Sequence, residues 1–360
     1  MSSKSFICKA PWTSVAFQPE GIGPCCIYEL ADLENFSDGR DQFDSIRTTF
    51  LNGEVPKGCQ RCQHAFLENR PGYYSSFDSY DTDFKSINIQ EINIKSNNLC
   101  NLACRSCGPH FSSKWEEEFN KTIIISKDHE IFNRLKFIDF KKLKSIRFAG
   151  GEPTMTGDHV QVLKHLIDIN HVDVGIVLST NLHNLHYKDV DLIKLWKQFP
   201  KLTLQLSIDG VEERAQSIRS GTDWNLVCEN LRIIQDNQIN YCVNVTVSAL
   251  NIWFLEETIQ YLKQKLDVTS IKYSILSTPD ILDIQVIPEE YRSDIVSMLD
   301  RCIASGHDVT HIKKYLNLSV RDELWNHFLI YNLMLDVTRK ETFFENLPIK
   351  NQLINKWVRL

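Results

Sequence analysis

Three cysteines stand close together in the run Cys100-Asn-Leu-Ala-Cys104-Arg-Ser-Cys107, with three and then two residues between them. Thiolates spaced in this way on one short loop can each bind one iron of a cubane iron–sulfur cluster. A fully thiolate-bound cubane takes four cysteines, so this loop leaves one iron open for another ligand. A structural zinc site takes four protein ligands in a closed shell. The spacing therefore favours a [4Fe-4S] cluster that performs chemistry.

A second group of cysteines lies in the first 62 residues, where Cys8 and Cys26 are followed by the close pair Cys59 and Cys62. Four thiolates would saturate a second [4Fe-4S] cluster, and a cluster without an open iron passes electrons rather than binding substrate. The same four thiolates also describe an all-cysteine zinc site, which stays open as an alternative. Cys25 adjoins Cys26, and the spacing favours Cys26 as the ligand.

A different pairing would join Cys59 and Cys62 with Cys104 and Cys107 in one zinc site. This pairing would leave Cys100 without a role. It would also explain neither the Gly-Gly-Glu run at residues 150–152 nor the polar faces of the strands described below. We therefore favour two separate centres.

The remaining cysteines, Cys228, Cys242 and Cys302, are isolated in the sequence. Cys228 and Cys302 each fall on an apolar stripe with helical period, which predicts packing in the core. Cys242 is also interpreted mostly as a packing residue. It shares the inward face of a predicted strand with Asn244, but it lies at the strand's N-terminal end, far from the predicted cofactor mouth.

From about residue 86 the sequence alternates between short β-rich runs and helix-compatible stretches. The candidate strands are Glu91–Lys95, Ser145–Ala149, Val174–Ser179, Leu202–Ile208, Tyr241–Ser248 and Ser270–Leu276. Strands separated by helix-length segments predict parallel β/α units with right-handed crossovers. Six such units fit an open, partial (β/α)6 barrel, TIM-like in form, better than a complete eightfold barrel. The fold class is therefore α/β.

Several of the candidate strands carry a polar residue at every second position. In residues 202–209 the polar residues are Thr203, Gln205, Ser207 and Asp209, and those between them are leucine or isoleucine. Parallel strands covered on both faces would be apolar on both, so a polar alternate face must meet something polar. We expect a ligand-filled lumen. A solvent-facing sheet is the alternative.

The two ends of the chain differ from the alternating pattern. Residues 1–85 are rich in proline and glycine and predict a small irregular module that needs an added constraint such as a metal centre. Residues 286–360 have a helical pattern. The expected domains are thus a cysteine-rich module (1–85), a partial barrel (86–285) and a helical C-terminal extension (286–360).

The chain of 360 residues carries 40 basic and 46 acidic side chains. This balance argues against nucleic acid as a partner, because phosphate binding needs a basic face. The sequence has neither an apolar run long enough to span a bilayer nor a secretory signal, so we expect a cytoplasmic protein with no membrane partner. Cytoplasmic thiols stay reduced, so 11 cysteines point to metal or redox chemistry rather than disulfides.

The cysteine loop, placed just after the first barrel strand, resembles the signature of the radical S-adenosylmethionine (SAM) superfamily. The resemblance implies that Cys100, Cys104 and Cys107 bind a catalytic [4Fe-4S] cluster whose open iron chelates SAM. It also implies reductive cleavage of SAM to methionine and a 5′-deoxyadenosyl radical that abstracts hydrogen from a substrate. An electron donor such as flavodoxin or ferredoxin is an implied partner.

Four further stretches match places where that family contacts SAM, each at or just beyond the end of a predicted strand. The implied cofactor-binding residues are Gly150, Gly151, Glu152, Ser179, Thr180, Asn181, Ser207, Asp209 and Arg219. In the GGEP-like motif the backbone and Glu152 would hold the methionine amino group, and Arg219 would pair with the methionine carboxylate. Taken singly, Glu152 could instead begin a helix and Arg219 could lie on the surface. Ser106 departs from the aromatic or large residue that usually precedes the third cysteine, so adenine stacking must come from elsewhere.

The turn Pro24-Cys25-Cys26, with the spacing Gly21-x4-Cys26, resembles the start of the SPASM and twitch auxiliary-cluster modules. In the better-known members that module follows the barrel, whereas here it precedes it, as in a set of bacterial and phage proteins. The resemblance implies an auxiliary [4Fe-4S] cluster on Cys8, Cys26, Cys59 and Cys62.

A closed auxiliary cluster suggests a net oxidation. We therefore expect a radical SAM oxidoreductase or maturase-type enzyme acting on an unidentified peptide, protein or small polar molecule. The alternative is a non-catalytic zinc-binding interaction module.

Overall fold

The computed structural model describes residues 6–18, 21–28, 40–67, 72–95, 97–119, 132, 134–343, 345 and 347–348 of the 360. The chain divides into two compact units. The first unit comprises Met1–Cys100, Phe119–Ser179 and Asn184–Thr203. The second unit comprises Asn101–Glu118, Thr180–His183 and Leu204–Leu360. The three domains expected from the sequence stay a prediction.

The fold is mixed α/β, with a mostly parallel sheet whose strand order is β12-β11-β9-β6-β5-β3-β1-β2. In chain order these strands are β1 (Ser14–Gln18), β2 (Gly21–Gly23), β3 (Glu91–Ile94), β5 (Ser145–Phe148), β6 (Gly175–Thr180), β9 (Leu202–Ser207), β11 (Tyr241–Val247) and β12 (Ile271–Ile275). Within this sheet, β1 and β2 are the one antiparallel pair among the registers that the described residues give. The described strands do not close into a barrel, in agreement with the expected open α/β fold.

All six strands expected from the sequence are present, and each end lies within one residue of its expected place. The alternation that predicted them is visible in their burial. Leu202, Leu204 and Leu206 of β9 are buried, whereas the polar residues between them are half-buried. Both a lumen and a solvent-facing sheet would produce this pattern, so the lumen stays a prediction.

In the first unit, β1 belongs to the segment that was expected to be irregular. Its five residues are all buried, and it pairs in parallel with β3 from Ser14↔Glu91 to Phe17↔Ile94. The ring of Phe6 lies 5.4–6.0 Å from the rings of Phe50, Phe66 and Tyr74. Aromatic pairs of this kind stabilise a core beyond the area they bury. The segment therefore builds part of a core from its own side chains, and its expected metal centre stays a prediction.

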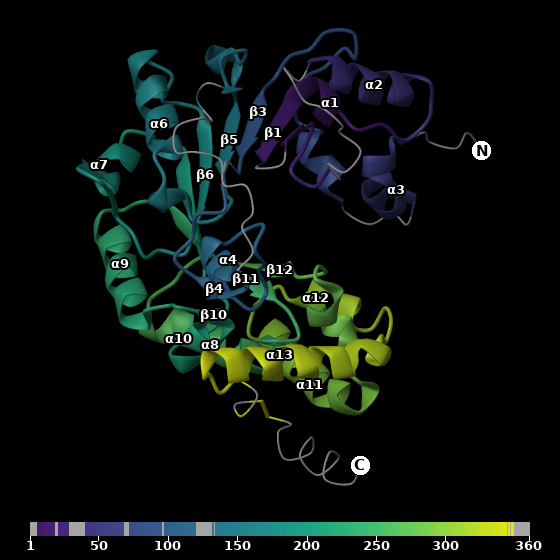
Figure 1. Ribbon diagram of the computed structural model, residues 1–360, viewed down its shortest axis with the longest axis vertical. Coiled ribbons are helices and arrows are strands. Elements are labelled where there is room, and N and C mark those ends of the chain that lie inside the picture. The colour runs from purple at the N-terminus through teal and green to yellow at the C-terminus, as the bar shows by residue number, and fades with distance from the viewer. Residues whose placement is uncertain are drawn as a thin grey trace. The chain divides into compact units, whose positions relative to one another are not determined.

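The helices of the first unit lie around these strands (Figure 1). They are α1 (Ala10–Thr13), α2 (Arg40–Leu51), α3 (Gln60–Leu67), α6 (Asp158–Asp168) and α7 (Leu192–Trp196). A two-stranded ribbon of β7 (His186–Tyr187) and β8 (Val190–Asp191) precedes α7. In α6 the apolar residues Val160, Leu163 and Leu166 are buried, which gives the helix its packed face.

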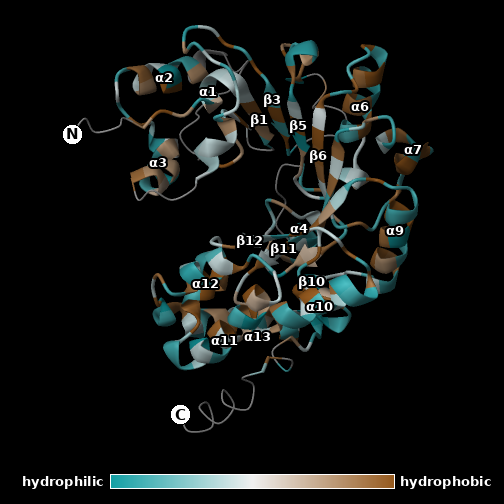
Figure 2. Cartoon of the chain, turned by 180° about the vertical axis from the view of Figure 1, so that it is seen from behind, coloured by the Kyte–Doolittle hydropathy of each residue, from teal (hydrophilic) through white to brown (hydrophobic). Residues whose placement is uncertain are grey.

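The second unit contains the other helices of the described residues and a short antiparallel ribbon of β4 (Ala103–Cys104) and β10 (Arg219–Ser220). The helices are α4 (Ser113–Phe119), α8 (Glu213–Ile218), α9 (Trp224–Asp236), α10 (Leu255–Lys265), α11 (Arg292–Ala304), α12 (Thr310–Leu316) and α13 (Trp325–Arg339). Figure 2 shows that α9 carries both hydrophobic and hydrophilic residues, as an amphipathic helix on a sheet must.

Between residues 286 and 343 every described element is helical, as expected for the C-terminal extension. Residues 349–360 of that extension lie outside the described residues. Within the part of the chain that the structure describes, none of the helices combines the length and hydrophobicity needed to cross a bilayer.

Candidate functional site

Cys104 and Cys107 lie in the second unit, on the loop that follows β4. The β4–β10 ribbon places Cys104 directly opposite Arg219, and the amide of Cys107 donates to the carbonyl of Cys104 at 3.0 Å. Burial raises the pKa of the Cys104 thiol, while the charge of Arg219 partly opposes that rise. Burial, followed by the charge of Cys104, raises the pKa of Cys107 to about 12. The two thiols therefore lie close together, and a metal that binds them must displace their protons.

Arg219 is held in place by a buried carboxylate. Its Nη1 lies 2.7 Å from Oδ2 of Asp209, whose side chain is 3% exposed. The other oxygen, Oδ1, accepts from the amide of Thr246 at 2.7 Å. The backbone carbonyl of Asp209 accepts from Nδ2 of Asn251 at 2.9 Å. Asp209 thus orients the guanidinium beside Cys104, and a guanidinium presents the fork of donors that binds carboxylates.

The expected pairing of Arg219 with a methionine carboxylate stays a prediction, since its partner in the structure is Asp209. With a side chain only 17% exposed, Arg219 is not the surface residue of the alternative interpretation. Ser207, also expected to contact SAM, is half-buried and pairs in register with Asn244 of β11.

Thr180 and Asn181 form the turn that follows β6, and both belong to the second unit. Oγ1 of Thr180 accepts from the amide of Leu182 at 3.0 Å. Nδ2 of Asn181 donates to Oδ1 of Asn101 at 2.8 Å. Asn101 directly follows Cys100 in the sequence, so Asn181 touches the cysteine loop as well as its own turn. Ser179, half-buried at the end of β6, belongs to the first unit.

In the first unit, the Gly-Gly-Glu run packs on the segment that leads into the cysteine loop. The amide of Gly151 donates to the carbonyl of Asn97 at 3.1 Å, and that of Glu152 donates to Leu99 at 2.7 Å. A Cβ at Gly151 would lie 2.2 Å from the carbonyl oxygen of Leu99. Gly150 has a φ of +117°. Glycine is therefore required at both positions, at the first for its conformation and at the second for close approach.

Glu152 is buried, and its carboxylate has a local role. Its Oε1 accepts from the amide of Thr154 at 3.1 Å and from Oγ1 of the same residue at 2.7 Å. These bonds cap the short 3-10 helix Pro153–Met155. This is the helix-start role that sequence analysis left open. A contact with the SAM amino group stays a prediction.

His159, in the first turn of α6, is 1% exposed. Burial lowers the pKa of its imidazole to about 4, and the nearby backbone of Pro153 and Thr156 only partly opposes this. Because the folded pKa is below the unfolded value, the unfolded chain binds a proton that the folded chain rejects as the pH falls from about 6.5 toward 4. Stability must therefore fall over this range.

We expect the free energy of unfolding to fall by about 2 kcal/mol as the pH is lowered from about 7 to about 5, because the folded chain resists protonation of His159. A His159→Asn variant should lose that part of the pH dependence, whatever its stability at pH 7. Urea unfolding of both proteins at the two pH values measures it. An identical pH dependence in the two proteins would contradict a neutral, buried ring.

The N-terminal cysteines are gathered in the first unit, where electrostatic interactions connect their thiols. They are Cys8, Cys25, Cys26, Cys59 and Cys62. Burial raises the pKa of Cys8 and of Cys59 to about 12. Backbone hydrogen bonds reach three of the sulfur atoms: from Ala10 to Cys8, from Ile27 to Cys25, and from Tyr73 and Tyr74 to Cys62. Such bonds favour the thiolate form that binds metal.

Both Cys25 and Cys26 have sulfur neighbours among the N-terminal cysteines. The Cys25 thiol interacts with those of Cys26, Cys8 and Cys59, whereas Cys26 also interacts with Cys62 and with the hydroxyl of Tyr73. Either cysteine could therefore complete a set of four. In the described residues, no three side chains of the His, Cys, Asp or Glu types are arranged around one metal position. The ligand sets thus rest on donor type, sequence spacing and this electrostatic neighbourhood.

The three isolated cysteines differ from one another. Cys302 is buried, and its Sγ lies 3.8 Å from Sδ of Met298, so its packing role is confirmed. Cys228 is only half-buried, at the edge of the stripe that packs α9. Cys242 is half-buried near the start of β11.

Sequence analysis missed the side chains that hold the cysteine loop. Nε1 of Trp115 donates to the carbonyl of Cys104 at 2.9 Å. Arg339 of α13 covers the Trp115 ring at 4.7 Å and pairs with Glu118 at 2.7 Å. Arg105 is fully buried inside the loop itself. A charged residue next to a buried cysteine was the one available signal, because such a residue must have a partner elsewhere in the chain.

Residues 94–264 match the family model of the radical SAM superfamily. Among curated proteins, the chain is 26% identical over 180 residues to a probable GTP 3′,8-cyclase of Sulfurisphaera tokodaii, which covers 46% of this chain and 55% of the relative. It is 28% identical over 144 residues to GTP 3′,8-cyclase of Clostridium botulinum, covering 40% of this chain and 42% of the relative.

A third relative is the 7,8-dihydro-6-hydroxymethylpterin dimethyltransferase of Methanocaldococcus jannaschii, 25% identical over 194 residues, with 48% of this chain and 35% of the relative covered. The chain thus spans about half or less of the length of these relatives.

Solved structures with some likeness include native anSMEcpe with bound AdoMet, at a TM-score of 0.41 and 19% identity over 52% of each chain. Streptococcus suis SuiB bound to S-adenosylmethionine gives a TM-score of 0.41 and 13% identity, covering 65% of this chain and 51% of SuiB.

Proposed function

We propose that the protein is a radical SAM enzyme that binds a catalytic [4Fe-4S] cluster through Cys100, Cys104 and Cys107. Three thiolates suit a cubane with one iron left for SAM. When bound, this cofactor pair supplies an electron to SAM and yields a 5′-deoxyadenosyl radical that abstracts hydrogen from substrate. Everything else in the reaction depends on how the chain's own residues bind and orient SAM and substrate.

The observation that carries the proposal is the β4–β10 ribbon, which sets the thiol of Cys104 opposite Arg219. Arg219 would receive the methionine carboxylate, while the buried carboxylate of Asp209 keeps the guanidinium aligned. A cluster ligand and a carboxylate-binding cation are thereby fixed on neighbouring strands. A zinc site for structure alone has no use for such a cation.

The other implied contacts would serve the rest of SAM. The backbone at Gly150 and Gly151, with the carboxylate of Glu152, suits the methionine amino group. Hydroxyl and amide groups on strand ends suit the ribose, and the chain offers these at Ser179, Thr180, Asn181 and Ser207. Adenine has no assigned stacking partner, since Ser106 cannot provide one.

The N-terminal cysteines would bind a closed auxiliary [4Fe-4S] cluster in a twitch- or SPASM-like module. Cys8, Cys59 and Cys62 would supply three thiolates, with Cys26 or Cys25 the fourth. The electrostatic interactions among their thiols and the backbone hydrogen bonds to their sulfur atoms support this assignment. A cluster held there would supply a one-electron acceptor, which suits the net oxidation expected of an oxidoreductase or maturase.

The substrate is a peptide, a protein or a small polar molecule. The curated relatives are named for GTP and for a pterin, which are small and polar. The half-buried polar residues of β9 and the bonded pair Asn244–Ser274, 2.8 Å apart, suit hydrogen-bonding groups of either class. A one-electron donor such as flavodoxin or ferredoxin would supply the catalytic site.

Anaerobic reconstitution with iron and sulfide, followed by reduction in the presence of SAM, tests the proposal. We expect about eight irons per chain and release of 5′-deoxyadenosine. About four irons with deoxyadenosine release would retain the catalytic site and overturn the auxiliary one. Stoichiometric zinc, no iron and no SAM cleavage would overturn both and leave a zinc-binding interaction module.

A further inference from the structure

Arg105 carries a buried charge inside the cysteine loop. Its side chain is 0% exposed. Nε donates to the carbonyl of Ser217 at 2.7 Å, and Nη1 donates to the carbonyl of Asn332 at 3.1 Å. A guanidinium buried in this way is stable only if its donors are satisfied. The loop is therefore connected both to the end of α8 and to α13.

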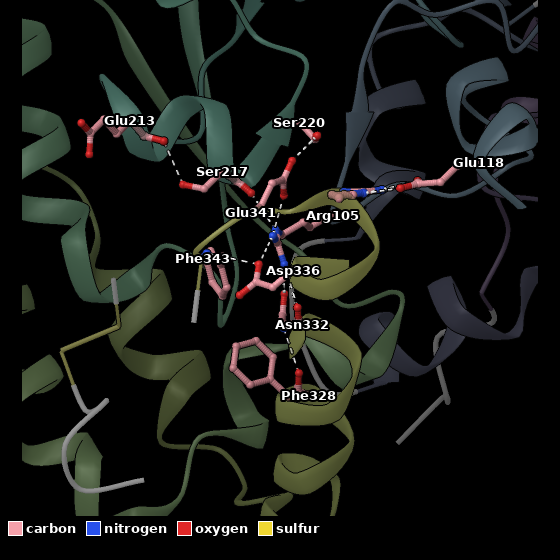
Figure 3. A network of polar contacts seen from close by, with 11 residues as sticks. Arg105, Glu118, Glu213, Ser217, Ser220, Phe328, Asn332, Asp336, Glu341 and Phe343 are labelled. Atoms are coloured by element: carbon pink, nitrogen blue, oxygen red, sulfur yellow. Dashed lines mark hydrogen bonds and ion pairs between the residues drawn. The ribbon is translucent and has the colours of Figure 1, made fainter. Parts of the chain in front are cut away.

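Two carboxylates neutralise this charge, and both lie near the C-terminal end of α13. Nη2 of Arg105 pairs with Asp336 and, at 2.6 Å, with Oε2 of Glu341. The ring of Phe343 covers the guanidinium at 4.7 Å. Figure 3 shows Asp336, Glu341 and Asn332 converging on the Arg105 side chain. The hydroxyl of Tyr331, one helical position earlier, donates to the Arg105 carbonyl at 2.7 Å.

Glu341 also reaches the opposite strand. Its second oxygen, Oε1, accepts a hydrogen bond from Oγ of Ser220 (Figure 3). Ser220 follows Arg219 in β10 and pairs in register with Ala103 of β4. One carboxylate thus binds the residue after β4 and a residue within β10. It spans the two strands that carry Cys104 and Arg219.

The ribbon needs this support because each of its strands has only two residues. Two-stranded sheets are marginally stable in water even when they are longer. Without an added constraint, the separation of Cys104 from Arg219 would vary. The buried ion pairs supply the constraint, since charge-assisted hydrogen bonds fix geometry more tightly than neutral ones.

We propose that Arg105, Glu341 and Ser220 form a clamp through which the C-terminal segment sets the position of Arg219 relative to Cys104. This inference rests on the proposed function. The three are positioning residues, because they act on SAM through Cys104 and Arg219 and do not touch it. The clamp makes SAM binding, rather than cluster assembly, depend on residues more than 200 positions away in the sequence.

The second unit offers a matched control in Arg292. It is also a buried arginine, 3% exposed, and its donors reach four backbone carbonyls. Those carbonyls belong to Gln285, Ile287, Leu316 and Ser319. None of these residues belongs to the ribbon or to the cysteine loop. Arg292→Lys therefore perturbs a buried arginine of the same unit without altering the clamp.

The experiment compares anaerobically reconstituted Arg105→Lys, Glu341→Gln, Ser220→Ala and Arg292→Lys with the unmodified protein. Iron content is measured, and SAM affinity is titrated through the change in the electron paramagnetic resonance spectrum of the reduced cluster. For Arg105→Lys and Glu341→Gln we expect retained iron and a SAM Kd raised roughly tenfold. Ser220→Ala, which loses one hydrogen bond, should raise it roughly threefold. Arg292→Lys should lower the melting temperature and leave the SAM Kd unchanged.

The outcomes separate the two proposals. If the unmodified protein neither binds SAM nor cleaves it, the proposed function fails and the clamp fails with it. If the unmodified protein is active and the clamp variants match Arg292→Lys in SAM Kd, only the clamp is overturned. If Arg105→Lys does not fold, the SAM Kd values of Glu341→Gln and Ser220→Ala test the clamp in its place. A double variant that combines Arg105→Lys with Glu341→Gln should have a SAM Kd no higher than that of either single variant. This result would support the clamp, because the effects of substitutions at coupled residues are not additive.

Discussion

Replacement of Cys104 by alanine is expected to reduce 5′-deoxyadenosine formation to the uncatalysed background. Two remaining thiolates cannot hold a cubane with a single open iron. Cys104 also adjoins Arg219, so its loss removes the neighbour of the cation proposed to bind the methionine carboxylate. Chromatographic measurement of deoxyadenosine after reduction with SAM present records the effect.

Cys59→Ala and Cys302→Ala are the controls for this result. The first removes a thiolate from the N-terminal group, so the iron content should fall from about eight to about four while SAM cleavage continues. Cys302 packs against Met298, and its replacement should alter neither iron content nor cleavage. Equal loss of cleavage in Cys104→Ala and Cys59→Ala would contradict the division of roles between the two centres.

Gly151→Ala is expected to lower the free energy of unfolding by about 3 kcal/mol or more. The added Cβ would lie 2.2 Å from the carbonyl oxygen of Leu99 and 2.6 Å from the carbonyl carbon of Asn98. Both are backbone atoms and cannot rotate away. The segment before Cys100 would have to move, which would also displace this proposed cluster ligand. Urea unfolding under anaerobic conditions measures the loss.

Gly108→Ala is the matched control, because it makes the same chemical change beside the third cysteine of the loop. A Cβ at Gly108 would meet nothing within 4 Å. Gly108→Ala should therefore change the free energy of unfolding by no more than about 0.5 kcal/mol. Similar costs at Gly151 and Gly108 would show that the close approach of the Gly-Gly-Glu run is not a constraint.

The six barrel strands could be predicted because each has a local signal. Leu202–Ser207 alternates apolar and polar residues over its whole length, and helix-length segments separate it from its neighbours. Strand β1 has no such signal. Its residues Ser14–Gln18 are buried on both faces and include one β-branched residue. Pairing with β3, more than 70 residues further along, stabilises it, and that pairing leaves no mark on the local sequence.

The residues of the candidate site also fall into two groups, those with a local sequence signal and those without one. The candidate cluster ligands and the strand-end residues rest on cysteine spacing and strand position, which are both local signals, and these assignments stay predictions. The partners of Arg105 could not be predicted, because Asp336 and Glu341 lie 231 and 236 residues away along the chain. The first lies on a helix and the second in the turn beyond it, so no periodic pattern connects them with the loop. Only the fold brings these charges together.

The clamp also has a consequence for the order in which the protein matures. Arg105 is translated well before its carboxylate partners, which follow it by 231 and 236 residues. Chains fold as they are synthesised, with N-terminal parts first. Until Glu341 has left the ribosome, the guanidinium of Arg105 lacks this partner and the clamp is incomplete. The proposed arrangement of Arg219 opposite Cys104 for SAM binding is therefore completed later in synthesis than the cysteine loop itself.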